Sequence, residues 1–499
     1  MNSTRNPVKK QNRYNINVQL LLATISIFLL SFYPVSDSDF GWHLRTGEYI
    51  FNYHQVPHNF LFSFTNTDYQ YVYYSWAAEL LTYSFYKYFG LWGATVLYAT
   101  ILTTSILILI KTSLLFAKKE FFLPYFLVLT PFAHTVAGGR TIVFGLLFLS
   151  LIYFLFTKFK KNKSITIWLI PLVFLAWANF HASFIVGFPL LIYLFASGFI
   201  KGVSNPKFTL KMAFFVVALS FLATFVNPYF TGVWSQTILI TTKELFNLKS
   251  VNPGWASPLN MGTVGIIFIF VLALISIFIS SVRKVDLSQK IIIFALFVLS
   301  LVTFRFLFVL TIFLTPALYL AILEFKKRLS IQIQSSIPIK VSIFTLFSVL
   351  ALIAATNNLQ SNLAYASFDK YTYYISTYSP NKKLYSQWSQ QAYSFFKENL
   401  KNKKVLTEAN WGGLFILEDP QIKVFYYSAQ DNVVLNSKPF PFEYLALVNA
   451  TNGWQEKLDK YNVEVVFLPI SYPIIEKLKR SLNWGIVYED KTVTILAKN

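Results

Sequence analysis

The sequence contains no cysteine, which excludes both a disulfide framework and any thiolate metal site. Charged residues are also scarce, at 13% of the chain against about 25% in an ordinary soluble domain. Acids are especially rare in residues 1–357, which hold only nine of the 22 Asp and Glu side chains. Phe, Leu, Ile and Val dominate the same stretch. Residues 1–357 are therefore predicted to lie largely within a membrane.

Apolar runs of membrane-spanning length recur throughout this region, and each crossing needs roughly 20 residues. The segments 121–157 and 289–323 are too long for one crossing and are predicted to turn near Gly138-Gly139-Arg140 and near Arg305. The first span is expected to stay as an uncleaved anchor, because no A-x-A-like site follows it. We predict a polytopic α-helical membrane protein with about 11 transmembrane helices, at 17–34, 91–115, 121–137, 141–157, 165–181, 183–200, 209–227, 261–282, 289–304, 306–323 and 339–357.

The distribution of Lys and Arg predicts the orientation of the chain in the membrane. Alternate loops hold 21 and 6 basic residues, and cytoplasmic loops carry the excess of positive charge. The N-terminus is therefore expected in the cytoplasm, and the chain in a bacterial inner or plasma membrane. A first loop at 35–90 and everything after residue 357 are expected outside. The net charge of +21 is mostly a topology signal, so nucleic-acid binding is not supported.

Residues 358–499 have a different composition, with 13 acids, 16 bases and no membrane-length apolar run. Short buried strands alternating with amphipathic helices favour a small extracytoplasmic α/β domain. Asn410-Trp411-Gly412-Gly413 lacks the spacing of a phosphate-binding loop and is predicted to be a tight turn, with Trp411 on the core or at the membrane. The predicted helices are 384–400, 441–449, 453–461 and 472–482, and the predicted strands are 403–407, 421–427, 463–468 and a hairpin at 484–497.

Five of the nine acids in the membrane region lie in the first loop: Asp37, Asp39, Glu48, Asp68 and Glu79. A carboxylate at a membrane surface can bind a divalent cation such as Mg²⁺ or Mn²⁺, or take a proton as a general base. His43 could serve as a ligand or an acid/base group, and Arg45 could bind a phosphate. The alternative is that these side chains only cap a helix or face water.

Three further polar residues lie where apolar helices meet on the outer side. Arg140 and Arg305 are candidates for phosphate binding, because a charge at membrane depth is costly and points to function. Each could instead form a structural ion pair with a first-loop acid. His181, after Trp177-Ala-Asn179-Phe, is more often a hydrogen-bonded structural residue in such a position, with substrate binding as its functional alternative.

The first loop carries a resemblance to a known family. Asp39-Phe-Gly-Trp42-His43-Leu-Arg45 resembles the D-x-x-x-H-x-R pattern of some oligosaccharyltransferase catalytic subunits. The layout of many spans, an aromatic helix over 76–90 in the membrane interface and an external C-terminal domain is similar to the GT-C superfamily of membrane glycosyltransferases. It also resembles bacterial mannosyltransferase-like membrane proteins. The W-W-D-x-G acceptor motif of oligosaccharyltransferases is absent, which favours a simpler lipid-sugar transferase.

The resemblance implies that residues 1–357 form a catalytic module that takes a sugar from a polyprenyl-phosphate donor. The acceptor would be an extracytoplasmic glycan, lipid or protein, and transfer would invert the sugar's configuration. It implies Asp39, or Asp37 in its place, as the base or metal ligand. His43, Arg45, Arg140, His181 and Arg305 are the predicted substrate-binding residues. The alternatives are a transporter or lipid flippase, which the lack of acids within the spans disfavours, and a non-catalytic assembly protein.

Overall fold

The computed structural model describes residues 21, 24–32, 35, 37–116, 138–162, 165–201, 207–244, 257, 262–328, 388–435, 438–451 and 453–499. These residues belong to two compact units. The first unit comprises Met1–Tyr33 and Thr95–Gln360, and the second comprises Pro34–Ala94 and Ser361–Asn499. The first loop thus shares a unit with the C-terminal segment, from which it is separated by hundreds of residues.

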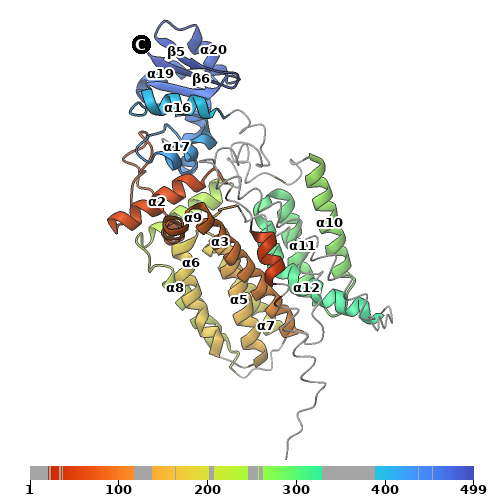
Figure 1. The fold of residues 1–499 in the computed structure, drawn as a ribbon. Helices are drawn as coiled ribbons and strands as arrows, with labels where there is room; N and C mark the ends of the chain where they lie inside the picture. Colours follow the sequence, from red (N-terminus) through yellow and green to blue (C-terminus); the bar gives the residue numbers. More distant parts are fainter. Residues whose placement is uncertain are drawn as a thin grey trace, which may run out of the picture. The chain divides into compact units, whose positions relative to one another are not determined.

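The first unit is built from apolar helices, because almost every residue in these runs can face another helix or lipid. Helix α5 packs against α6, α7 and α12; α6 also packs against α8; and α11 packs against α10 and α12 (Figure 1). The helices are α5 (Val143–Asn162), α6 (Ile170–Phe180) after the 3-10 helix η2 (Ile165–Leu169), α7 (Phe184–Ile200), α8 (Leu210–Ala223), α9 (Gly232–Glu244), α10 (Gly262–Ser280), α11 (Leu287–Val302) and α12 (Leu307–Arg328).

Eight of the predicted apolar runs coincide with one of these helices or with α3 (Trp76–Phe116), which contains the run at 91–115. The runs at 121–137 and 339–357 lie outside the described residues, as does most of 17–34. Within the described part of the chain, three helices are long and apolar enough to cross a membrane: Trp76–Phe116, Val143–Lys161 and Leu307–Glu324. Five others are apolar but shorter. The number of crossings stays a prediction.

Both predicted turns lie at helix ends. Gly138 and Gly139 have φ of 85° and 90°, a left-handed conformation that favours glycine, and α5 begins four residues later. The chain between α11 and α12 turns through the short 3-10 helix η5 (Phe304–Phe306), which contains Arg305. Helix α9 lies between the predicted runs at 209–227 and 261–282 and belongs to neither.

Helix α3 breaks at Gly90, where φ is 59° and ψ is −152°. The aromatic segment predicted to be a separate helix ends at this residue, so the break confirms that boundary. Residues up to Ala94 belong to the second unit and residues from Thr95 to the first. The position of the aromatic segment in the membrane interface stays a prediction.

The C-terminal segment of the second unit contains a four-stranded sheet in the order β1-β4-β6-β5. Strand β1 (Val405–Thr407) pairs in parallel with β4 (Val465–Pro469), and β6 (Val493–Lys498) runs antiparallel to β4 and to β5 (Trp484–Glu489). A two-stranded ribbon joins β2 (Val434–Leu435) and β3 (Lys438–Pro439). The helices are α16 (Gln390–Asn399), α17 (Gly412–Glu418), α18 (Phe440–Val448), α19 (Trp454–Lys460) and α20 (Pro473–Lys479).

Two local predictions in this segment are wrong. The predicted strand at 421–427 forms only isolated bridges through Val424, to Val405 and to Ser63 of the first loop. The predicted turn at Asn410-Trp411-Gly412-Gly413 is helical, because the 3-10 helix η6 (Ala409–Trp411) runs directly into α17. Trp411 is fully buried and packs edge-on against Phe467, so its predicted place on the core is confirmed.

Candidate functional site

The two leading acids stand at the start of α2 (Phe40–Tyr53). The Asp37 carboxylate accepts the backbone N–H of Asp39 over 2.9 Å, and its carbonyl accepts the N–H of Phe40 over 3.1 Å. Asp39 occupies the N-cap position, yet its side chain makes no capping hydrogen bond to the helix. A capping role, the alternative that the sequence leaves open, therefore does not account for this carboxylate.

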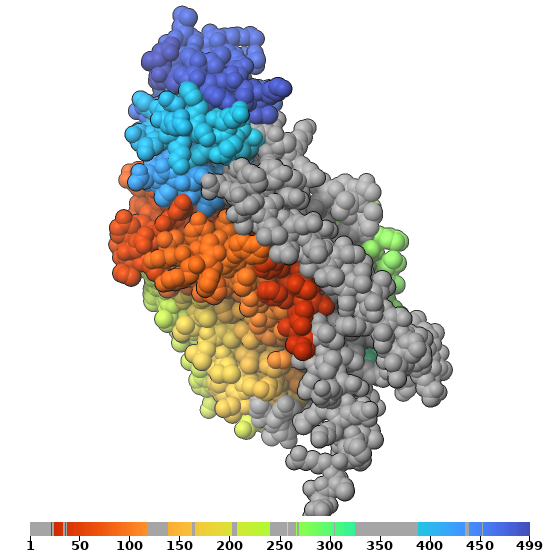
Figure 2. Space-filling view, viewed as in Figure 1, coloured from red at the N-terminus to blue at the C-terminus, as the bar shows by residue number. Residues whose placement is uncertain are grey.

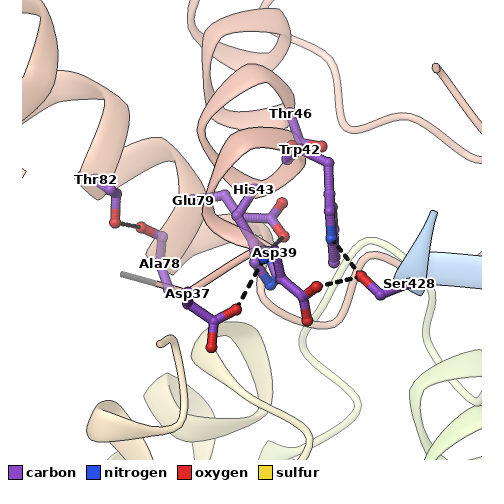
Figure 3. A network of polar contacts seen from close by, with 9 residues as sticks. All are labelled: Asp37, Asp39, Trp42, His43, Thr46, Ala78, Glu79, Thr82 and Ser428. Carbon is purple, nitrogen blue, oxygen red and sulfur yellow. Dashed lines mark hydrogen bonds and ion pairs between the residues drawn. The ribbon is translucent and has the colours of Figure 1, made fainter. Parts of the chain in front are cut away.

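The Asp39 carboxylate is instead held by the C-terminal segment. Ser428, the first residue of the 3-10 helix η7 (Ser428–Asn432), donates its hydroxyl proton to Asp39 Oδ1. The same Ser428 oxygen accepts the indole N–H of Trp42 over 3.0 Å. Figure 3 shows these three side chains together at the start of α2. One carboxylate oxygen of Asp39 is thus fixed by a residue 389 positions away.

A second polar pair lies beside Asp39. His43 Nδ1 lies 2.7 Å from Glu79 Oε1, and the Glu79 side chain is only 1% exposed. The imidazole ring stacks on Trp42 at 3.6 Å between ring centroids. Its Nε2 atom forms no hydrogen bond within the described residues. The contact between Nδ1 and the buried Glu79 side chain fixes the orientation of the ring.

Arg45 links α2 to the C-terminal end of α17. Its Nε donates to the carbonyl of Leu417 over 2.9 Å, and a second guanidinium nitrogen donates to the same oxygen. The third nitrogen forms an ion pair of 2.6 Å with Glu48, whose other oxygen accepts the hydroxyl of Tyr83 over 3.2 Å. All three nitrogens of this guanidinium already have a partner. A phosphate bound by Arg45, as predicted, would therefore share these nitrogens with Leu417 and Glu48. That contact stays a prediction.

Glycines let the start of α2 approach α17 closely. A Cβ on Gly41 would lie 1.9 Å from the carbonyl oxygen of Gly413, and a Cβ on Gly413 would lie 2.0 Å from that of Ser38. Any side chain at either position would therefore collide with backbone. Figure 2 shows the blue atoms of the C-terminal segment directly adjoining the orange-red atoms of the first loop. The acids are consequently held against the C-terminal segment by the backbone as well as by side chains.

Glu408 caps the 3-10 helix η6, whose Asn410 contacts Ser38. Its carboxylate is 3% exposed and accepts the backbone N–H groups of Asn410 and Trp411 over 2.8 Å and 3.1 Å. Burial raises the pKa of Glu408 to about 7, against the opposing effect of these hydrogen bonds. The Asn410 amide oxygen in turn accepts a long hydrogen bond of 3.5 Å from Ser38, next to Asp39.

The other three predicted site residues belong to the first unit. Arg140 follows the two left-handed glycines before α5, and Arg305 lies in η5; both side chains are partly exposed. His181 ends α6, where its Nδ1 accepts the backbone N–H of Ser183 over 3.0 Å. This contact gives His181 a structural role at the α6–α7 junction. Substrate binding by these three residues stays a prediction.

The carboxylates of Asp37 and Asp39 fit one mode of cation binding. Mg²⁺ is often held by only one or two carboxylates and keeps several waters. Within the described residues, no group of three or more His, Cys, Asp or Glu side chains is placed to enclose a metal ion. Two adjacent acids suit a loosely enclosed, water-rich cation and do not suit a tetrahedral zinc site. The metal role predicted for Asp39 stays a prediction on these grounds.

The fold can be compared with solved structures. No protein-family model matches the chain, and no curated protein matches it in sequence. The apo oligosaccharyltransferase of Archaeoglobus fulgidus superposes with a TM-score of 0.55 and 12% identity, over 91% of this chain and 69% of that one. The same archaeal enzyme, AglB, in complex with an inhibitory peptide and a dolichol-phosphate, gives 0.53 and 11%, over 92% and 70%.

ArnT from Cupriavidus metallidurans aligns over 99% of this chain and 98% of its own, at 12% identity. Its TM-score is 0.48. The chain has the fold of the archaeal oligosaccharyltransferase. The resemblance predicted from the first-loop motif is thereby confirmed at the level of the fold. The apolar helices and this fold make the chain a helical membrane protein.

Sequence reasoning misses two residues of the site. The sequence alone gives Glu79 a loop or interface role, because 36 residues separate it from His43 and no local spacing joins them. Ser428 carries no signal, since serine is common in loops and its hydroxyl acquires meaning only beside Asp39. An acid within an otherwise aromatic and apolar helix is the one available hint for Glu79.

Proposed function

We propose that this chain is a glycosyltransferase that moves one sugar from a polyprenyl-phosphate donor to an extracytoplasmic acceptor, with inversion. The proposal rests chiefly on Asp39. This carboxylate begins a helix without capping it, receives a hydroxyl proton from Ser428, and lies beside the His43–Glu79 pair. An acid at an N-cap position usually caps its helix, whereas the Asp39 carboxylate is held by the C-terminal segment.

The chemistry is a single displacement at the anomeric carbon of the donor sugar. The acceptor hydroxyl attacks that carbon, its proton passes to the Asp39 carboxylate, and the bond from the carbon to the phosphate oxygen breaks. The leaving group is the polyprenyl phosphate. Attack from the face opposite the leaving group inverts the configuration. Asp39 acts as the general base, a contribution of about 10²–10⁴-fold in rate; Asp37 is the alternative acid.

The leaving phosphate gains negative charge as the bond breaks, so a cation near it lowers the barrier. His43, oriented by Glu79, would donate from Nε2 to a phosphate oxygen. Arg140, Arg305, His181 and Arg45 keep the substrate-binding roles that the sequence predicts for them. In the alternative in which Asp39 is a metal ligand and not the base, a divalent cation held there would supply positive charge. Dolichol-phosphate is the lipid phosphate in the AglB complex, which supports the choice of donor class.

The test is to incubate purified protein with a panel of radiolabelled polyprenyl-phosphate sugars and follow loss of label from the lipid. Asp39→Asn is expected to reduce transfer at least about 100-fold, since the amide cannot accept the proton. Asp68→Asn is the matched control, because Asp68 is an exposed acid of the same loop. Asp39→Asn protein that folds normally and transfers sugar at the parental rate would exclude Asp39 as the base. A parental chain that uses no donor in the panel would argue against the proposed activity.

A further inference from the structure

The hydrogen bonds around Ser428 have only one possible direction. An indole N–H can donate and cannot accept, so Trp42 donates to the Ser428 oxygen. The Ser428 hydroxyl therefore uses its own proton to donate, and Asp39 Oδ1 accepts it. The order Trp42 to Ser428 to Asp39 places a polarised hydroxyl on the carboxylate. A hydrogen bond to an ionised group is stronger than one between neutral groups.

Ser428 is itself held firmly in place. The residue before it, Tyr427, is fully buried. The Gln430 side-chain oxygen accepts the backbone N–H of Tyr427 over 3.3 Å, and the Gln430 side-chain amide donates to the Thr65 hydroxyl of the first loop over 2.8 Å. Thr65 in turn donates to the carbonyl of Phe425 over 2.7 Å. The C-terminal segment and the first loop thus fix the serine from two sides.

We propose that Ser428 is a positioning residue for the transfer reaction, and that the C-terminal segment thereby completes the acid site. This inference rests on the proposed function, in which Asp39 is the base. The serine hydroxyl fixes one carboxylate oxygen and turns the other oxygen toward the acceptor. The C-terminal segment is then part of the reaction centre.

Removing the hydroxyl should lower the rate of transfer, because the Asp39 carboxylate loses the donor that fixes one of its oxygens. For Ser428→Ala we expect transfer to slow about tenfold or more.

Ser428→Thr and Ser428→Val form a matched pair, because the two side chains have nearly the same shape and only threonine carries a hydroxyl. Threonine should recover part of the lost rate and valine should not. Ser481→Ala, in the same segment but outside the network, is the control for general loss of a serine. Equal rates for the Thr and Val variants, or a Ser428→Ala rate that matches the parental rate, would overturn the proposal.

A measurement without substrate separates this inference from the proposed function. Thermal melting of Asp39→Ala, Ser428→Ala and the double variant in detergent tests the contact alone. The sum of the decreases in melting temperature of the two single variants should exceed the decrease in the double variant by about 2 °C or more. Additive losses would refute the contact. Coupled losses together with full activity of Asp39→Asn would refute the base assignment, and the catalytic role of Ser428 with it.

Discussion

At the scale of single residues, Glu79 is the most costly side chain in the candidate site. It is 1% exposed, and its Oε2 atom is buried without a hydrogen-bond partner among the described residues. Its other oxygen meets His43 at 2.7 Å. Removing a carboxylate from water costs free energy, and only good pairing geometry and further hydrogen bonds offset that cost. An apolar residue would pack here at lower cost, so the pair points to a requirement for holding the His43 ring in place.

The first prediction at this scale concerns that pair. Glu79→Gln keeps the shape and replaces the carboxyl group that holds His43 Nδ1 with an amide, so the ring is oriented less well and we expect transfer to fall about tenfold or more. His43→Asn should have a comparable effect. The variant with both changes should be no slower than the slower single variant, because the two groups act as one unit. Initial rates across a pH series measure this.

Glu398→Gln is a suitable control for the pair, since Glu398 is an exposed acid on α16. Parental rates for Glu79→Gln at every pH would show that the pair is structural only. Rate losses that multiply in the double variant would show that His43 and Glu79 act independently.

At the scale of secondary-structure elements, the junction of α2 and α17 depends on the absence of side chains. Gly413→Ala would place a methyl group 2.0 Å from the carbonyl oxygen of Ser38. Backbone must then move, and overpacking of this kind costs about 1–3 kcal/mol. Asp39 would move with it, so transfer should fall as well. Thermal melting and transfer assays on the same preparation measure both effects.

Gly485→Ala provides the comparison, because a Cβ there meets only the end of the Asn499 side chain, at 3.1 Å. That side chain can shift at little cost. If Gly413→Ala melted and transferred sugar like Gly485→Ala, the close approach would not matter for the site.

The same junction explains where prediction from the sequence succeeds and fails. Long apolar runs reveal their helices, because burial over many residues outweighs local preferences. Gly412-Gly413 resembles a turn, yet Gly412 has helical angles of −52° and −46°. Its lack of a side chain serves a close approach to Tyr426, since a Cβ on Gly412 would lie 2.7 Å from the Tyr426 carbonyl oxygen. Local sequence cannot distinguish glycine used for a turn from glycine used for contact.

Partners that are distant in the chain account for the remaining differences. Val424 has the burial of a strand residue, but its neighbours are single residues of β1 and of the first loop, so no ladder forms. Asp39 could be chosen from its motif and its acid-poor surroundings. Ser428 and Glu79 could not, because their roles depend on tertiary contacts across 389 and 36 positions.

At the scale of the whole molecule, the predicted orientation in the membrane can be tested with introduced cysteines, because the sequence contains none. Lys284 lies in the predicted inner loop between α10 and α11, and Lys491 lies in the turn between β5 and β6. The test variants are Lys284→Cys and Lys491→Cys. Both positions are exposed. Each variant carries one thiol, which a membrane-impermeant maleimide can label without competing sites.

In intact cells stripped of any outer barrier, the reagent should label Lys491→Cys and leave Lys284→Cys unlabelled. Permeabilisation should expose both, because the positive-inside rule places Lys284 in the cytoplasm. The opposite pattern would invert the proposed topology and remove the extracytoplasmic acceptor from the proposed reaction.

The link between Asp39 and Ser428 also governs when the site can form during synthesis. Chains grow at about 5–20 residues per second, and these two residues are 389 positions apart. The first-loop acid therefore emerges roughly 20 to 80 s before the serine that positions it. Until then it has no hydroxyl from Ser428, no Gly413 backbone against Ser38 and no Leu417 carbonyl for Arg45. A nascent chain is therefore expected to carry Asp39 long before the site is complete, and activity would arise only after Ser428 has been synthesised.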